Sequence, residues 1–226
     1  MFINKSMTRR VITIGPDADI FEAQRKMSEH NIRHLPVVDD DGKLIGIVTD
    51  RDLRSAMPLE FIKHQGDCQE VRDKLQDMRI REIMTPDPTT ITPHYTIQDA
   101  LLLIQQLKVG ALPVVDDRGR LTGIISVRDL LRAFINVLGI GEPGTLLCIL
   151  AEDRIGEMKR IVDAITEENI SVGSILVARY WDKNKRAVFP YLMTNNVVRI
   201  KKKLQELGFS LLDPMEWYLD QLPKNE

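Results

Sequence analysis

The chain contains the same sequence pattern twice. Residues 7–57 align without a gap on residues 84–134, and the segment Leu-Pro-Val-Val-Asp-Asp at 35–40 recurs unchanged at 112–117. A duplication of this kind marks a structural unit that cannot bury its apolar face alone and needs its copy to complete a core. We therefore expect residues 7–134 to form one paired module, and we expect this module, rather than a catalytic centre, to carry the function.

Each copy predicts the order helix, strand, turn, strand, helix. In the first copy, apolar residues recur at helical spacing over 20–27, and 35–38 and 44–48 are short apolar runs typical of buried strands. A hairpin turn is expected at Gly42, because glycine tolerates the positive φ of tight turns. The second copy repeats the pattern with a helix at 97–104, strands at 112–115 and 121–125, and a turn at Gly119. We expect the two copies to pack face to face about a pseudo-twofold axis.

The last third of the chain follows a different pattern. Residues 139–144 have the spacing G-x-G-x-x-G, but they follow a helix and contain a proline, so we interpret them as a linker and not as a dinucleotide-binding loop. The order beyond them, strand-helix-strand-strand-helix-strand, is that of the ferredoxin-like fold. Pro190 falls inside a predicted strand, where we expect a bulge or an early strand end. The predicted strands are 145–151, 171–178, 187–193 and 209–212, and the predicted helices are 156–168 and 197–207.

Composition and charge narrow the class of protein. The chain has 226 residues, a formal net charge of −2 and two cysteines. This charge gives no support to nucleic-acid binding, and no apolar run approaches the ~20 residues of a membrane helix. The first residues have no signal-peptide pattern, and the cysteines form no CxxC pair. We therefore expect a cytoplasmic protein that binds neither nucleic acid nor membrane.

The motif Thr49-x-x-Asp52, repeated as Ser126-x-x-Asp129, allows two interpretations. In the structural one, the hydroxyl and the acid form a capping box at the start of a helix, which contributes about 1 kcal/mol. In the functional one, the helix N-terminus and the hydroxyl hold a phosphate, and the carboxylate accepts hydrogen bonds from two ribose hydroxyls. The motif by itself favours capping.

The doubled pattern resembles a tandem pair of CBS domains. The resemblance is carried by Leu-Pro-Val-Val-Asp, the glycines that follow it and Thr/Ser-x-x-Asp-Leu, with Met-Thr at the start of each copy. It implies a non-catalytic module that binds an adenosine ligand (AMP, ADP, ATP or S-adenosylmethionine) in clefts between the copies and that commonly forms a homodimer. The implied ligand-binding residues are Ile12, Arg33, His34, Pro36, Thr49, Arg51, Asp52, Thr89, Ala111, Pro113, Ser126, Arg128 and Asp129.

The two implied clefts differ in sequence. Arg33 and His34 align with Gly110 and Ala111 of the second copy. The cleft of the first copy therefore has one cationic and one titratable side chain at positions where the cleft of the second copy has neither. We expect unequal occupancy, with Arg33 and His34 adding phosphate contacts in one cleft.

The C-terminal part resembles an ACT domain, a regulatory module that often binds amino acids at dimer interfaces. The resemblance lies in Glu-Asp-Arg-Ile-Gly at 152–156 and Asn-Ile-Ser-Val at 169–172. Ile155 and Ser171 depart from the usual proline and asparagine of the family, so amino-acid binding and a dimerisation role both stay open. A CBS pair followed by this domain resembles the CBS–ACT proteins called acetoin utilization proteins. The expected limits are 1–57 and 84–138 for the CBS repeats, 58–83 for the connector, 139–144 for the linker, 145–213 for the ACT-like domain and 214–226 for the tail.

No set of residues in the sequence predicts an active site. Cys68 and Cys148 are interpreted as inert, and His30 and His34 lack a second cluster of metal ligands. We therefore expect a regulatory protein, not an enzyme, with no cofactor apart from a regulatory nucleotide and no metal. A constitutive assembly scaffold with vestigial clefts is the alternative.

Overall fold

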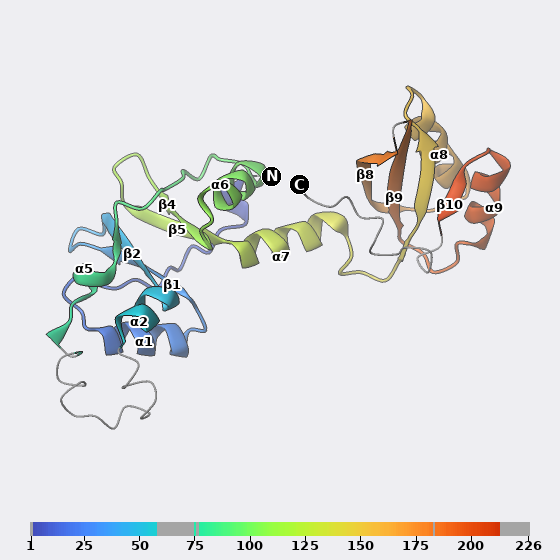
Figure 1. The fold of residues 1–226 in the computed structure, drawn as a ribbon. Helices are drawn as coiled ribbons and strands as arrows, with labels where there is room; N and C mark the ends of the chain where they lie inside the picture. The colour runs from blue at the N-terminus through green and yellow to red at the C-terminus, as the bar shows by residue number, and fades with distance from the viewer. Residues whose placement is uncertain (1, 58–74, 76, 183, 213–226) are drawn as a thin grey trace. The chain divides into compact units, whose positions relative to one another are not determined.

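The computed structural model describes residues 2–57, 75, 77–182 and 184–212. The chain divides into two compact units, Met1–Leu131 and Arg132–Glu226 (Figure 1). Most of the expected connector, including Cys68, lies outside the described residues, and so does the expected tail. The expected domain limits stay a prediction, although the division into two units falls within one helix that ends at the expected linker.

The first unit contains the two copies of the predicted pattern. The first copy consists of α1 (Ile20–Glu29), β1 (His34–Val38), β2 (Leu44–Thr49) and α2 (Asp50–Ala56). The second copy consists of α6 (Ile97–Leu107), β4 (Ala111–Val115), β5 (Leu121–Ser126) and α7 (Val127–Leu138). Short elements precede the copies: a 3-10 helix η1 (Ile3–Lys5), the helix α5 (Ile80–Ile83) and the strand β3 (Thr85–Pro86). The mixed α/β fold and the predicted order are confirmed.

The hairpins β1–β2 and β4–β5 are antiparallel and have the same register shift before the last residue of β1 and of β4. Gly42 and Gly119 both have a φ of 75°, as the turn chemistry requires. The two turns also meet each other, because the amide of Leu44 donates to the carbonyl of Gly119 and that of Leu121 donates to the carbonyl of Gly42. These reciprocal hydrogen bonds place the pseudo-twofold axis between the two hairpin turns.

The segments that lead into each copy are exchanged between the copies. Thr8 forms a β-bridge with Ile124 of the second copy, whereas Thr85 in β3 pairs with Ile47 of the first. The chain then returns to its own copy, where Ile14 pairs in parallel with Val37. Each copy therefore supplies one strand segment to the other.

The core of the first copy includes residues from the expected connector. Leu75 and Ile80, which are 2% and 0% exposed, pack with Ile14, Ile20 and the other buried residues of this copy. Ile80 is also fixed by its backbone amide, which donates to the carbonyl of Ala18. The end of the connector thus belongs to the packed module.

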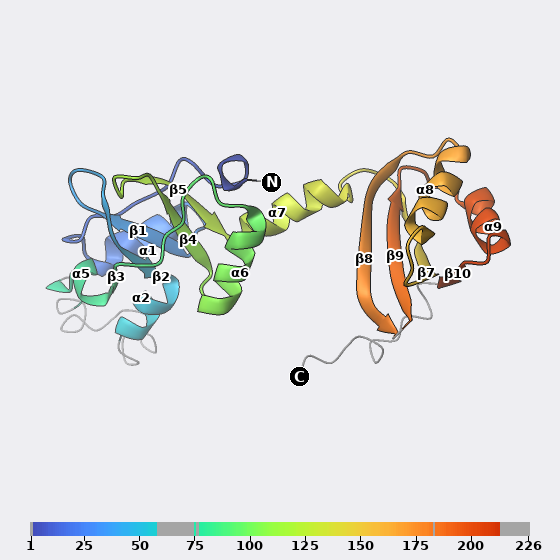
Figure 2. The same ribbon diagram turned by 90° about the horizontal axis from the view of Figure 1, so that it is seen from above.

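The second unit has the ferredoxin-like topology predicted from its element order. Its sheet runs β10-β7-β9-β8 with all neighbours antiparallel, and α8 and α9 cover one face of the sheet (Figure 2). A short strand, β6, extends the line of β7 along β9. The elements are β6 (Thr145–Leu146), β7 (Cys148–Glu152), α8 (Glu157–Glu167), β8 (Val172–Asp182), β9 (Lys185–Leu192), α9 (Val198–Glu206) and β10 (Ser210–Leu212).

The expectation at Pro190 was wrong. Strand β9 runs straight through Pro190, and the interruption falls on the neighbouring strand, where Leu147 separates β6 from β7. The amide of Leu147 donates to the carbonyl of Pro190 at 3.1 Å, but the proline has no N–H to return the bond. The predicted single strand 145–151 is therefore two strands in one unbroken register, and the proline removes one ladder bond while β9 continues past it.

Within the described part of the chain, no helix combines the length and apolarity needed to cross a bilayer.

Candidate functional site

The first Thr-x-x-Asp motif forms a complete capping box. The amide and the hydroxyl of Thr49 both donate to Oδ2 of Asp52, at 2.8 and 2.7 Å, and the amide of Asp52 donates to Oγ1 of Thr49 at 3.3 Å. The structural interpretation of the motif is therefore confirmed. All of these bonds use one carboxylate oxygen, and among the described residues Oδ1 of Asp52 accepts no hydrogen bond.

The second motif forms the same box with an additional partner. Ser126 donates from its amide and its hydroxyl to Oδ2 of Asp129, at 2.9 and 2.6 Å. Here Oδ1 is also engaged, because the hydroxyl of Thr8 from the first copy donates to it at 3.3 Å. Asp129 is 6% exposed, whereas Asp52 is half-buried. Because of the exchanged leading segment, both oxygens of Asp129 already accept hydrogen bonds. Oδ1 of Asp52 can still accept one from a ligand hydroxyl.

His34 joins the first box to the second copy. It is the residue paired with Thr49 across the β1–β2 hairpin, and its ring lies against Gly110, where a Cβ would be 2.6 Å from Nε2. Burial lowers the pKa of His34 below its usual value of 6.5, the charge of Arg33 lowers it further, and Asp52 partly opposes both effects. At neutral pH the ring is therefore mainly uncharged and can act as one donor and one acceptor.

The other residues implied by the resemblance lie along the same strand ends. Pro36 and Pro113 are buried, and each accepts a backbone bond from its own leading segment, from Ile14 and Ile91 respectively. Ala111 pairs with Ser126 as His34 pairs with Thr49. Ile12 is half-buried against the core of the first copy, whereas its counterpart Thr89 is exposed. The arginines Arg33, Arg51 and Arg128 are exposed.

A cavity of about 300 Å³ opens between α1 and α2, and its position was not predicted from the sequence. Of the implied ligand residues only Arg33 lines it. One wall is a single face of α2, formed by Asp50, Leu53 and Arg54, and Asp50 and Arg54 are ion-paired at 2.7 Å. The i, i+3, i+4 spacing of these three residues, which places them on one face of a helix, was the sequence signal that could have pointed to this wall. The cavity lies on a different face of α2 from the capping box, so Arg33 alone connects the two places.

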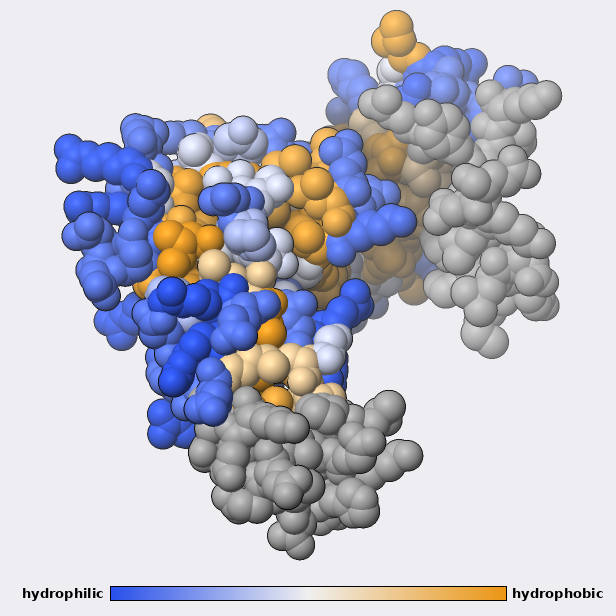
Figure 3. Space-filling model, turned by 60° about the vertical axis from the view of Figure 1, so that its left-hand side comes forward, coloured by the Kyte–Doolittle hydropathy of each residue, from blue (hydrophilic) through white to orange (hydrophobic). Residues whose placement is uncertain are grey.

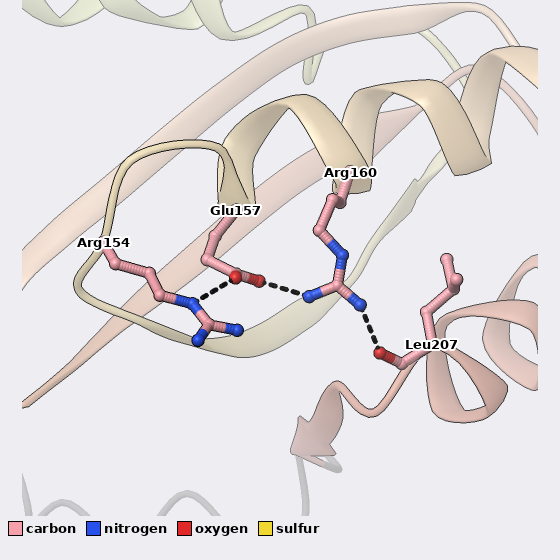
Figure 4. Close-up of polar contacts among 4 residues, drawn as sticks. All are labelled: Arg154, Glu157, Arg160 and Leu207. Atoms are coloured by element: carbon pink, nitrogen blue, oxygen red, sulfur yellow. Dashed lines mark hydrogen bonds and ion pairs between the residues drawn. The ribbon is translucent and has the colours of Figure 1, made fainter.

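The loop after β7 in the second unit is held by ion pairs between its own residues and the start of α8. Glu157 is 6% exposed and accepts from Nε of Arg154 at 2.6 Å and from Arg160 at 2.8 Å (Figure 4). Arg160 also donates to the carbonyl of Leu207 at 2.6 Å. The hydrogen bond from Arg154 is the largest cause that lowers the pKa of Glu157. Arg154 and Arg160 are thus both occupied by an internal carboxylate.

The described residues contain no group of three or more histidine, cysteine, aspartate or glutamate side chains placed to hold a metal ion.

Comparison with known proteins decides the family. The CBS domain family matches residues 3–59 and 80–136, which include both boxes, both hairpins and both exchanged segments. The chain belongs to the CBS domain family. The family limits begin four residues before the predicted second repeat, in agreement with the place of Ile80 in the packed module.

The relatives that share this pair differ in what surrounds it. A CBS domain-containing protein of Dictyostelium discoideum is 36% identical over 61% of this chain and 94% of its own length. An inosine-5'-monophosphate dehydrogenase of Methanocaldococcus jannaschii is 35% identical over 54% of this chain but only 21% of its own length. The likeness to the dehydrogenase therefore extends to only a fifth of that enzyme.

Two solved structures are similar at the level of fold and sequence. CBSX2 in complex with AMP is 29% identical, with a TM-score of 0.50 over 59% of this chain and 96% of that one. A protein from Vibrio cholerae named as a candidate acetoin utilization protein (AcuB) is 30% identical, with a TM-score of 0.51 over 63% of this chain and 98% of that one. Neither match covers the whole of this chain.

Proposed function

We propose that this protein is a regulatory sensor that binds an adenine nucleotide at the first capping box. The observation that carries the proposal is the unoccupied carboxylate oxygen of Asp52 at a half-buried position, next to the ring of His34. The similar structure of CBSX2 holds AMP, and CBS domain pairs are generally regulatory. AMP, ADP, ATP and S-adenosylmethionine are the candidate ligands, and the nucleotide acts as a signal, not as a cofactor.

Each side chain around Asp52 has a chemical role in this proposal. Oδ1 of Asp52 accepts hydrogen bonds from the ribose hydroxyls while Oδ2 keeps the capping box intact. The helix α2 has only seven residues, so its N-terminus contributes little, and the exposed cations Arg33 and Arg51 supply most of the attraction for phosphate. The apolar side chains of Ile12 and Pro36 form the wall against which the adenine packs.

The second box is the weaker site in this proposal. Both oxygens of Asp129 are engaged, and a ribose would have to displace the hydroxyl of Thr8. Gly110 and Ala111 provide no charge for a phosphate, and Thr89 replaces the apolar wall of Ile12. Occupancy of the first site would shift the arrangement of the two copies only if the nucleotide binds the two arrangements with different affinity.

Calorimetric titration with AMP tests the proposal. Asp52→Asn keeps an acceptor for the capping box but removes the charge that accepts the ribose hydroxyls, so the affinity should fall by about tenfold to a hundredfold. Asp129→Asn is the matched control and should change the affinity by less than about threefold. Equal losses from the two substitutions, or no binding of AMP, ADP, ATP or S-adenosylmethionine by the unaltered protein, would contradict the proposal.

We further propose that the protein is a homodimer joined through the helices of the second copy. Leu101, Leu102 and Leu131 are 41%, 53% and 58% exposed, and the first copy has Gln24, Arg25 and Arg54 at the same positions. Figure 3 shows apolar residues at the surface of the first unit, bordered by hydrophilic ones. A surface that is apolar in only one of two related copies fits an isologous contact between two molecules. This contact would serve a sensor and an assembly scaffold alike.

We also propose that the second unit is an ACT-type domain and that the protein acts in acetoin utilization in the cytoplasm. The ferredoxin-like sheet order supports the ACT-type assignment, and the similarity to the Vibrio cholerae protein supports the link to acetoin utilization. Glu157 already occupies Arg154 and Arg160, and Asp153 pairs with Arg186, so the arginines described around the loop after β7 are each engaged by an internal carboxylate. A role in association therefore fits this domain better than amino-acid binding.

A further inference from the structure

The sheet of the second unit has two apolar faces. On one face, side chains such as Ile149 and Val188 pack with Ile161 of α8 and Ile200 of α9 in the main core. The opposite face, called here the second face, carries a separate apolar cluster. Its members are Cys148, Leu150, Ala178, Ala187, Phe189 and Leu212.

The apolar character of the second face extends to exposed leucines. Residues paired directly across antiparallel strands lie on the same face, so Leu176 lies beside Phe189 and Leu146 beside Tyr191. Leu176 is 46% exposed and Leu146 is 49% exposed. A sheet face that meets solvent normally alternates to polar residues. This face carries Ser174 and Ser210 but is otherwise apolar around Phe189, and none of the described helices contributes a residue to its cluster.

The linker approaches one end of the second face. The hydroxyl of Ser174 donates to the carbonyl of Leu138 at 2.7 Å, and the hydroxyl of Tyr191 donates to the carbonyl of Glu142 at 2.6 Å. Ala187 lies toward the other end, and Leu212, which pairs with Cys148, lies in the row of Phe189 between the two ends. An occupant of the remaining surface should therefore reach it from the side of β10.

We propose that the chain's own C-terminal segment, residues 213–222, packs on the second face. The chain reaches this segment directly from Leu212, which is itself a member of the cluster. The sequence Asp-Pro-Met-Glu at 213–216 has the cap residue, proline and glutamate typical of a helix start, and a second proline follows Leu222. Covalent continuity gives this segment an effective concentration in the millimolar range, an advantage over any separate partner.

The pattern and length of the segment fit the surface. Met215, Tyr218, Leu219 and Leu222 recur at i, i+3, i+4 and i+7, which places them on one stripe of a helix. A helix over 214–222 would be about 14 Å long at 1.5 Å per residue. Four strands spaced by ~4.8 Å are about as wide. One short amphipathic helix can therefore lie across the sheet from β10 to β8.

Thiol reactivity of Cys148 in the full chain tests this docking, because Cys148 is a member of the cluster and is 7% exposed. With Cys68→Ser as the background, Cys148 is the only thiol that reacts with Ellman's reagent. Leu219→Asp should speed its modification by about tenfold, which corresponds to about 1.4 kcal/mol of docking free energy. Gln221→Asp adds the same charge outside the apolar stripe and should leave the rate unchanged.

A second measurement separates undocking from unfolding. A chain that ends at Leu212 should react as fast as Leu219→Asp, and a synthetic peptide of residues 213–226 added in trans should restore the protection. Equal rates for the unaltered chain and for Leu219→Asp would overturn the proposal. Protection that grows with protein concentration would also overturn it, since a second copy would then be the occupant.

Discussion

Gly123→Ala tests the exchange of leading segments between the two copies. A Cβ at residue 123 would lie 2.6 Å from Sδ of Met7 and 3.1 Å from the carbonyl oxygen of Thr8. The first distance is a clash with a buried side chain and the second a tight contact with backbone. The side chain of Met7, the leading segment or both must therefore move away from β5, and overpacking of this kind costs about 1–3 kcal/mol of the free energy of unfolding. A movement of the segment would also lengthen the hydrogen bond from Thr8 to Asp129.

A double-mutant cycle isolates this contact. Met7 is 8% exposed, so Met7→Ala alone should cost about 2–5 kcal/mol through the cavity that it leaves. When both substitutions are present, the alanine methyl at 123 occupies part of that cavity, and the combined loss should be smaller than the sum of the two by about 1–2 kcal/mol. Urea denaturation at one pH supplies all three values. Additivity to within ~0.5 kcal/mol would show that Met7 does not pack on Gly123 and would refute the exchanged arrangement.

Three further predictions follow from charges and exposed surfaces. The lowered pKa of Glu157 means that its stabilising effect is present above its unfolded pKa of about 4.5 and is lost as the pH falls through the folded value. Denaturation of Glu157→Gln should therefore show a deficit at neutral pH that shrinks in acid, and a deficit that is constant with pH would contradict the ion pairs. For His34 the unfolded chain binds a proton more readily, so the free energy of unfolding should fall as the pH falls through about 6.5. His34→Gln should remove this part of the pH dependence in denaturation curves between about pH 7.5 and pH 5.5, and an unchanged slope would refute the pKa assignment. Leu102→Glu should convert the dimer to a monomer in analytical ultracentrifugation, whereas Arg25→Glu, at the same position of the first copy, should not; dissociation by both or by neither would exclude α6 as the contact.

The repeated sequence predicted the elements of the first unit because each local signal agreed with the fold. The glycines at 42 and 119 required turns, the apolar runs required buried strands, and the acids three residues after Thr49 and Ser126 required caps. Aligned sequences could not predict which copy receives which leading segment. The Met-Thr pattern would be the same whether Thr8 paired with its own copy or with the other. The pairing partner is determined by the packing of the folded module.

The sequence predicted that the two boxes differ because Arg33 and His34 align with Gly110 and Ala111. The largest structural difference, however, lies at two identical residues, Asp52 and Asp129. Asp52 and Asp129 occupy equivalent positions and have equivalent caps, yet only Asp129 has a hydrogen bond from Thr8. Thr85 stands in the equivalent place to Thr8, and among the described residues it forms no such bond with Asp52. The difference therefore lies in how the two segments pack, and the aligned sequences do not contain this information.

The strand break at Leu147 shows a different limit of sequence reasoning. The proline rule predicted a bulge or an early strand end at Pro190, but β9 continues through Pro190 and the interruption falls at Leu147 on the neighbouring strand. Pro190 faces Leu147 on one side and Ile175 on the other, and its absent N–H matters only toward Leu147. The effect therefore appears on the partner strand, which the local sequence around Pro190 does not contain.

Electron density for AMP in a crystal of this protein tests the central claim most directly. We predict one nucleotide bound at the first box, with both ribose hydroxyls within hydrogen-bonding distance of Oδ1 of Asp52 and the phosphate directed toward Arg33. The Thr8–Asp129 bond should remain intact in the same crystal. Density at Asp129 in preference to Asp52, or in the cavity between α1 and α2 alone, would contradict the account.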